Sequence, residues 1–107
     1  MQQTVMKSDP PRETRTPRSV LVVDDSRLQR RILSSMLKRW GYDVIEASTG
    51  SEALELCKKS RPEFIFSDWM MPELNGPDFC RAFRKLYPNT YSYFILLTSK
   101  SEKNDIA

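Results

Sequence analysis

Four short apolar segments alternate along this chain with longer amphipathic segments, and this alternation limits the possible folds more than any other feature. These segments cover residues 20–23, 42–47, 64–67 and 93–97, and the second of them, YDVIEA, also contains two acidic residues. Short runs of β-branched and aromatic residues bounded by polar ones predict strands that are buried on both faces. More than ten residues separate each strand from the next, so the connections are right-handed crossovers between parallel strands. The sequence therefore predicts an α/β fold, with a parallel sheet covered by helices on both faces.

Three of the amphipathic segments carry helix start or stop signals. Ser26 is a candidate N-cap and Gly41 a candidate C′ residue for the first helix, and a second helix is predicted over residues 51–60. Pro77 is well placed as the first residue of a third helix, and a fourth helix starts at Ser101 or nearby and runs to Ala107. The apolar positions of the first three helices are Leu28, Leu33, Ile32, Met36, Leu37 and Trp40, then Ala53, Leu54, Leu56 and Cys57, then Phe79, Phe83 and Leu86.

The first 18 residues differ in composition from the remainder. They hold three of the seven prolines and almost no apolar residues, which predicts a disordered tail followed by one domain over residues 19–107. The tail has four basic and two acidic residues, so it contributes 4 − 2 = +2 of the formal charge of +3. The basic character of the chain is therefore no footprint of nucleic-acid binding, and we expect none by this domain.

The chain contains no histidine and only two cysteines, Cys57 and Cys80, which form no CxxC pair. Zinc fingers, histidine-based metal sites and catalytic triads with an imidazole base are excluded, so carboxylates must carry any acid, base or metal chemistry. Both cysteines lie in amphipathic patterns and are interpreted as reduced thiols, which predicts a cytoplasmic location. The longest apolar run is five residues, too short to cross a membrane.

Polar residues follow three of the predicted strands. Asp24 and Asp25 follow the first strand, Asp68 the third, and Thr98 with Ser99 the fourth. In an open parallel sheet, ligands bind in the crevice outside the carboxyl ends of the strands. A single aspartate after a strand is equally explained by a turn or a helix cap. Three carboxylates in one crevice repel each other unless a cation compensates them, and an all-oxygen donor set suits Mg²⁺.

The segments VLVVDDS, FIFSDWMMPELNG and ILLTS, in this order and spacing, resemble the receiver domain of bacterial two-component response regulators over residues 19–107. The resemblance implies a flavodoxin-like, doubly wound sheet and a phosphorelay module. By this resemblance, Asp68 accepts a phosphoryl group from a sensor histidine kinase or a histidine phosphotransfer protein. Asp24, Asp25, Asp68 and the backbone carbonyl of Met70 would hold Mg²⁺, and Thr98 would be the switch hydroxyl.

The resemblance also implies that Pro72 and Gly76 shape the loop after the acceptor and that the module is no enzyme beyond its own phosphorylation and dephosphorylation. The family has a fifth strand ending in Lys-Pro and a fifth helix, and this chain ends before them. The domain is therefore expected to be incomplete at its C-terminus, with four strands only. An open fourth strand predicts that this chain alone is unstable or self-associates, as a homodimer through edge pairing or by exchange of the last elements between chains.

Two other functions are weighed against this one. An aspartyl-phosphate phosphatase also places a nucleophilic aspartate after a parallel strand, but it usually carries a second acid two residues later. Here Ser26 and Met70 occupy those positions after Asp24 and Asp68. A degenerate receiver that acts only as a protein-binding platform is the alternative to phosphorylation, and the complete acidic set argues against it.

Overall fold

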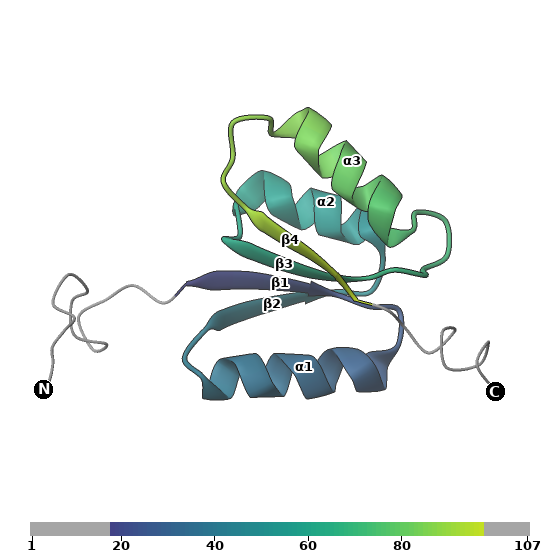
Figure 1. Cartoon of the computed structure of the whole chain (residues 1–107). Coiled ribbons are helices and arrows are strands. Elements are labelled where there is room, and N and C mark those ends of the chain that lie inside the picture. Colours follow the sequence, from purple (N-terminus) through teal and green to yellow (C-terminus); the bar gives the residue numbers. More distant parts are fainter. Residues whose placement is uncertain (1–17, 98–107) are drawn as a thin grey trace, which may run out of the picture.

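The computed structural model describes residues 18–97, which form a single four-stranded sheet with helices on both faces (Figure 1). The elements are β1 (Ser19–Val23), α1 (Arg27–Arg39), β2 (Asp43–Ala47), α2 (Gly50–Lys59), β3 (Phe64–Asp68), α3 (Gly76–Leu86) and β4 (Tyr93–Leu97). All strand pairs are parallel, in the order β2-β1-β3-β4. Helix α1 covers one face of the sheet, and α2 and α3 cover the other (Figure 1). The predicted flavodoxin-like α/β fold is confirmed.

The strand register brings the carboxyl ends of the strands to one edge of the sheet. Val23 pairs with Ala47 of β2 on one side and with Ser67 of β3 on the other. The Asp24 N–H donates to the Ala47 carbonyl at 3.2 Å, and the Trp69 N–H donates to the Leu97 carbonyl at 3.0 Å. The residues that follow β1 and β3 therefore lie beside one another.

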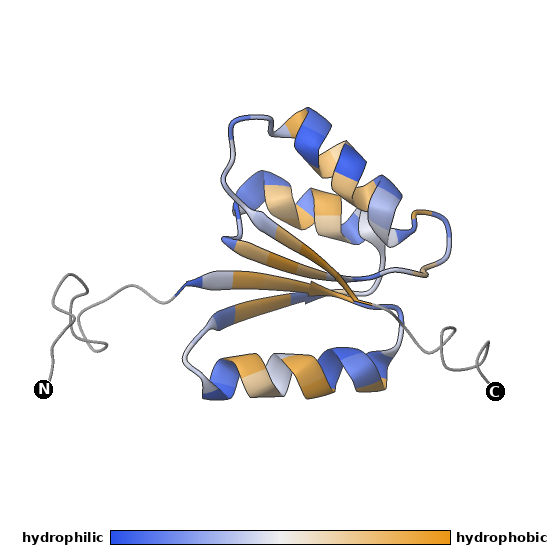
Figure 2. Cartoon of the chain, viewed as in Figure 1, coloured by the Kyte–Doolittle hydropathy of each residue, from blue (hydrophilic) through white to orange (hydrophobic). Residues whose placement is uncertain are grey.

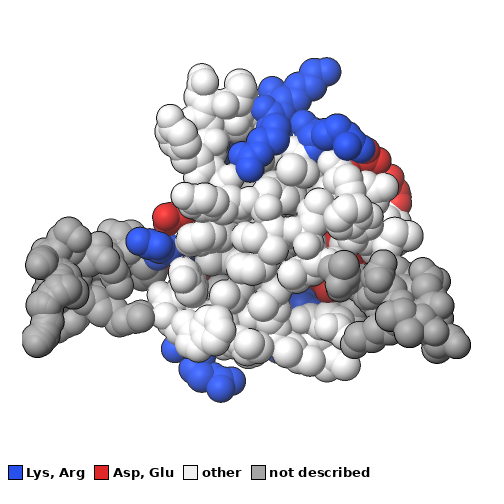
Figure 3. All heavy atoms as spheres, in the orientation of Figure 1, with Lys and Arg blue, Asp and Glu red and all other residues white. Residues whose placement is uncertain are grey.

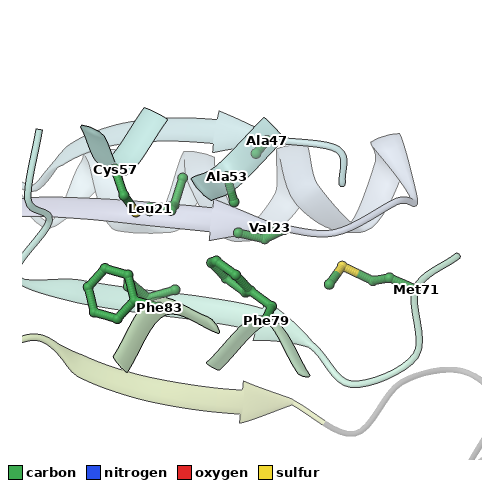
Figure 4. Packing of buried hydrophobic residues seen from close by; sticks show 9 residues of the cluster. Leu21, Val23, Ala47, Ala53, Cys57, Met71, Phe79 and Phe83 are labelled. Carbon is green, nitrogen blue, oxygen red and sulfur yellow. The ribbon is translucent and has the colours of Figure 1, made fainter. Parts of the chain in front are cut away.

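The larger hydrophobic cluster lies between the sheet and the helices α2 and α3. Phe79 and Phe83 of α3 are fully buried in it, and their ring centroids lie 5.0 and 6.0 Å from that of Phe94 on β4. Figure 4 shows both rings pointing toward the strands, next to Leu21 and Val23 of β1. Burial of two phenylalanines one helical turn apart fixes α3, and with it the loop between β3 and α3.

The prediction for the apolar face of α1 was partly wrong. Leu37 is buried and Leu33 packs against the smaller core cluster, but the apolar side chains of Leu28, Ile32, Met36 and Trp40 are exposed. At about 100° per residue, Leu28, Ile32 and Met36 lie about 100° to 180° around the helix axis from Leu37, so they fall outside the buried face, which instead contains Ser34. Figure 2 shows apolar segments alternating with polar ones along α1. In α3, Leu86 is likewise exposed instead of buried.

Polar side chains cap the N-termini of α1, α2 and α3. The Ser26 hydroxyl accepts from the Gln29 N–H, as predicted, and Gly41 after α1 has the positive φ of 96° that favours glycine. Thr49 caps α2, which begins at Gly50, and Asn75 caps α3, so the third helix begins one residue before Pro77. The fourth helix and the tail, apart from Arg18, fall on residues outside the described range. Within residues 18–97, no helix is long and apolar enough to cross a membrane.

Cys57 on α2 belongs to the larger core cluster, whereas Cys80 on α3 is only half-buried. Burial raises the pKa of the Cys57 thiol from 9.0 to about 11, against a smaller lowering effect of Arg61. The protonated thiol thus stabilises the fold below pH 9, and this contribution is lost as the pH rises through about 11.

We expect iodoacetamide at pH 8 to label Cys80 and to spare Cys57 until the protein unfolds, because the thiolate is the reactive form. Peptide mass spectrometry measures both sites, and equal labelling of the folded protein would contradict the expectation.

Candidate functional site

Three carboxylates meet at the carboxyl edge of the sheet. Asp24 and Asp25 follow β1 and Asp68 is the last residue of β3, so the central pair of strands supplies all three. One carboxylate oxygen from each lies within 4.8 Å of those of the other two. Asp68 is only 2% exposed, Asp24 is half-buried and Asp25 is exposed. The structure thus brings together the three acidic residues that the sequence singled out.

The backbone and side chain of Asp24 are fixed by several hydrogen bonds. Its Oδ1 accepts from the Ser26 N–H at 2.8 Å, at the entry to α1. Its carbonyl oxygen accepts from Nη1 of Arg30 at 2.7 Å. The Arg30 Nε also donates to Oε1 of Glu46 on β2, at 3.1 Å. Sequence reasoning missed Arg30 and Glu46, because they lie 16 residues apart on different elements and form no local pattern.

The loop after Asp68 packs closely against the backbone of β3. The Gly76 N–H donates to the Trp69 carbonyl at 2.9 Å, which closes the loop at the start of α3. A Cβ on Gly76 would lie 2.6 Å from the carbonyl oxygen of Asp68, so only glycine fits without a shift. The loop is thereby held to the residue that ends β3.

The tip of the same loop contains a tight turn. The Leu74 N–H donates to the Pro72 carbonyl at 2.7 Å, and Glu73 between them has φ 69°. Met71 is buried in the core cluster, whereas Trp69 and Met70 are 45% and 52% exposed. Trp69 is therefore an exposed residue next to Asp68. Met70 lies two residues after Asp68, and Thr98 lies outside the described residues.

The carboxylate cluster suits a small divalent cation. Octahedral Mg²⁺ with oxygens at about 2.1 Å places those ligands about 3.0 to 4.2 Å apart. Three carboxylate oxygens within 4.8 Å of one another need only small side-chain adjustments to reach such spacings. The donor set is all oxygen, which Mg²⁺ prefers, and two of its three residues remain open to solvent for metal-bound waters. The residues present therefore fit the ion.

Comparison with known proteins identifies the family of this chain. The response regulator receiver domain family matches residues 20–107 of the chain. The chain belongs to that family. It is 41% identical over 86 residues to the probable transcriptional regulator ycf27 of Porphyridium aerugineum, covering 80% of this chain and 35% of that protein. It is 37% identical over 91 residues to the alkaline phosphatase synthesis transcriptional regulatory protein PhoP of Bacillus subtilis, covering 82% and 36%.

Solved structures agree with this assignment. The chemotaxis protein CheY4 of Vibrio cholerae superposes with a TM-score of 0.72 at 33% identity, covering 84% of this chain and 78% of that one. The receiver domain of the histidine kinase CKI1 from Arabidopsis thaliana gives a TM-score of 0.71 at 28% identity, covering 76% and 65%. The chain spans about a third of the length of the curated relatives named above. Receiver domains are modules of two-component signalling and not classical enzymes.

Proposed function

We propose that this receiver domain takes a phosphoryl group onto Asp68 from a sensor histidine kinase or a histidine phosphotransfer protein, as part of a phosphorelay. The observation that carries the proposal is the place of Asp68. It ends β3 almost fully buried, with a carboxylate oxygen within 4.8 Å of oxygens of both Asp24 and Asp25. A carboxylate held at a strand end by the core beneath it is a positioned nucleophile.

In the proposed step, one carboxylate oxygen of Asp68 attacks the phosphorus atom in line with the bond to the donor. The P–O bond to Asp68 forms as the P–N bond to the phosphohistidine breaks, and the histidine nitrogen leaves with the electron pair of that bond. The reaction yields an acyl phosphate on Asp68 and a free histidine on the partner. Burial holds Asp68 in place, so the chain supplies orientation and the partner supplies the phosphoryl group.

Asp24, Asp25 and Asp68, with the backbone carbonyl of Met70, are the proposed ligands of Mg²⁺. When bound, the ion neutralises the phosphoryl oxygens and the repulsion among the three carboxylates. The Asp24 side chain is already oriented by the Ser26 N–H, so part of the donor set is preorganised. The Met70 carbonyl joins this set on the family resemblance, and Met70 lies in the loop that the bond from the Gly76 N–H to the Trp69 carbonyl closes.

Thr98 is proposed as the switch hydroxyl that hydrogen-bonds the phosphoryl oxygens after transfer and relays the change to the surface. It follows Leu97, which pairs with Asp68 in the register of β3 and β4. The register thus brings the last described residue of β4 beside the acceptor, which supports the proposal. The homodimer or element exchange, the absence of direct nucleic-acid binding and the cytoplasmic location stay predictions.

Titration with MgCl₂ tests the metal site, with fluorescence of Trp69 as the signal in a Trp40→Phe background. We expect binding in the submillimolar to millimolar range, because few carboxylates in an open crevice leave several waters on the ion. The Asp25→Asn variant is expected to weaken binding about ten-fold or more, since it removes a ligand charge from the cluster.

Asp43→Asn is the matched control, because Asp43 is an exposed aspartate at the opposite end of β2. This substitution removes the same charge far from the cluster. Because salt screens the charge over that distance, the Mg²⁺ affinity should stay within about two-fold of wild type. Absence of a fluorescence change together with absence of calorimetric heat in the parent protein would contradict a magnesium site here.

A further inference from the structure

Arg30 on α1 occupies an unusual position for an arginine on a surface helix. Its side chain is only 16% exposed, and it turns toward the sheet, where it bonds to Asp24, which follows β1, and to Glu46 of β2. Nη1 donates to the carbonyl of Asp24 at 2.7 Å, and Nε donates to Glu46 of β2 at 3.1 Å. The guanidinium thus links the first turns of α1 to the end of β1 and to β2.

The Asp24 carbonyl belongs to the peptide group that joins Asp24 to Asp25. Because a peptide is planar, fixing its oxygen also fixes the direction in which the chain continues to Asp25. The Asp24 N–H is bonded to the Ala47 carbonyl and its Oδ1 to the Ser26 N–H, and Arg30 adds a bond to the carbonyl oxygen of the same residue. Loss of the Arg30 contact would remove a bond that holds the peptide group between the two acidic residues.

From these contacts we propose that Arg30 is a positioning residue for the carboxylate cluster, which it preorganises for Mg²⁺ through the Asp24–Asp25 peptide. The inference rests on the proposed magnesium site and adds a residue to its support. Glu46 has a matching role: it neutralises the guanidinium and fixes its orientation, so that the positive charge does not compete with the cation.

The sign of the expected effect separates this role from a simple charge effect. Arg30 is a cation near three carboxylates, so by Coulomb's law alone its removal would strengthen Mg²⁺ binding. A positioning role predicts the opposite, because the ligands would have to be ordered when the ion binds. Arg31, the next residue of α1, is exposed and offers the same change of charge without the bond to Asp24.

The test compares the wild-type chain with Arg30→Met, Arg31→Met and Glu46→Gln by calorimetric titration with MgCl₂. Arg30→Met is expected to weaken binding about ten-fold, as is usual for the loss of an outer-shell partner. Glu46→Gln is expected to weaken it about three-fold, because it leaves the guanidinium without its counter-charge while keeping an acceptor for Nε. Arg31→Met should bind as tightly as wild type or slightly more tightly.

Amide hydrogen exchange in the metal-free protein supplies a readout that a general loss of stability would not reproduce. We expect faster exchange at the amides of Asp25 and Ser26 in Arg30→Met, with core amides such as that of Ile65 unchanged. Wild-type affinity and unchanged exchange at these two amides in Arg30→Met would overturn the inference while leaving the magnesium site standing. Failure of the wild-type chain itself to bind Mg²⁺ would instead overturn the proposed function, and the inference with it.

Discussion

Replacement of Asp68 by asparagine is expected to abolish phosphoryl uptake. The amide is a far poorer nucleophile than the carboxylate, and the change also removes a negative charge from the cluster of three aspartates. Asp68 is 2% exposed at the end of β3, whereas Asp25 is exposed, so the core holds the carboxylate of Asp68 in place and does not hold that of Asp25. Incubation with a small phosphodonor, followed by borohydride trapping and peptide mass spectrometry, measures the modification at each residue.

The matched control is again Asp43→Asn, which should be labelled at Asp68 to the same extent as wild type. Ser67, Thr98 and Ser99 are the hydroxyl groups to examine as alternative acceptors. Ser67 is fully buried, and its hydroxyl donates to the carbonyl of Asp68 at 3.1 Å. A label on a hydroxyl would show that the acceptor is misassigned. A folded wild-type protein with no label at any site would favour the binding platform without phosphorylation.

Most of the fold follows from local patterns that could be seen in the sequence. The strands β1 and β3 are apolar runs because both of their faces are covered, and this leaves helices as the only suitable connections. Once the strands are parallel, their carboxyl ends share an edge, so Asp24, Asp25 and Asp68 could be grouped before any coordinates were known. The role of each residue in the grouped site remains a proposal from family membership and geometry.

Other features depend on tertiary structure and left no readable signal. The apolar side chains on α1 outnumber the positions that the helix buries, so the sequence could not show that Ile32 and Met36 face away from the sheet. In the contact between Arg30 and Asp24, the arginine side chain donates to a backbone carbonyl. Every residue has such a carbonyl, so the contact depends on the path of the chain and leaves no pattern in the residue types. Gly76 likewise looked like a loop residue, although its lack of a side chain matters because of the backbone that it contacts.

Gly76→Ala is expected to destabilise the protein by about 2 kcal/mol, the usual cost of a methyl group forced into a filled site. The new Cβ would lie 2.6 Å from the Asp68 carbonyl oxygen and 2.8 Å from Cδ2 of Leu96. The oxygen belongs to the backbone of the last residue of β3, so it can retreat only by displacing Asp68. We therefore expect Mg²⁺ affinity and phosphoryl uptake to fall together with the free energy of unfolding measured in urea.

Gly50→Ala provides the comparison, because Gly50 is also the first residue of a helix and is also buried. There the nearest atom to a new Cβ is Cδ2 of Leu74 at 2.9 Å, the end of a flexible side chain that can rotate away. Alanine is a better helix former than glycine, and this preference offsets part of the energetic cost of the remaining contact. The change in unfolding free energy should therefore stay within about 1 kcal/mol. The two variants add the same methyl group at the same helical position, and they differ in whether the neighbour can move. Equal losses of stability at both positions, or full Mg²⁺ affinity in Gly76→Ala, would show that the Asp68 backbone is less rigidly held by this loop than the packing around Gly76 indicates.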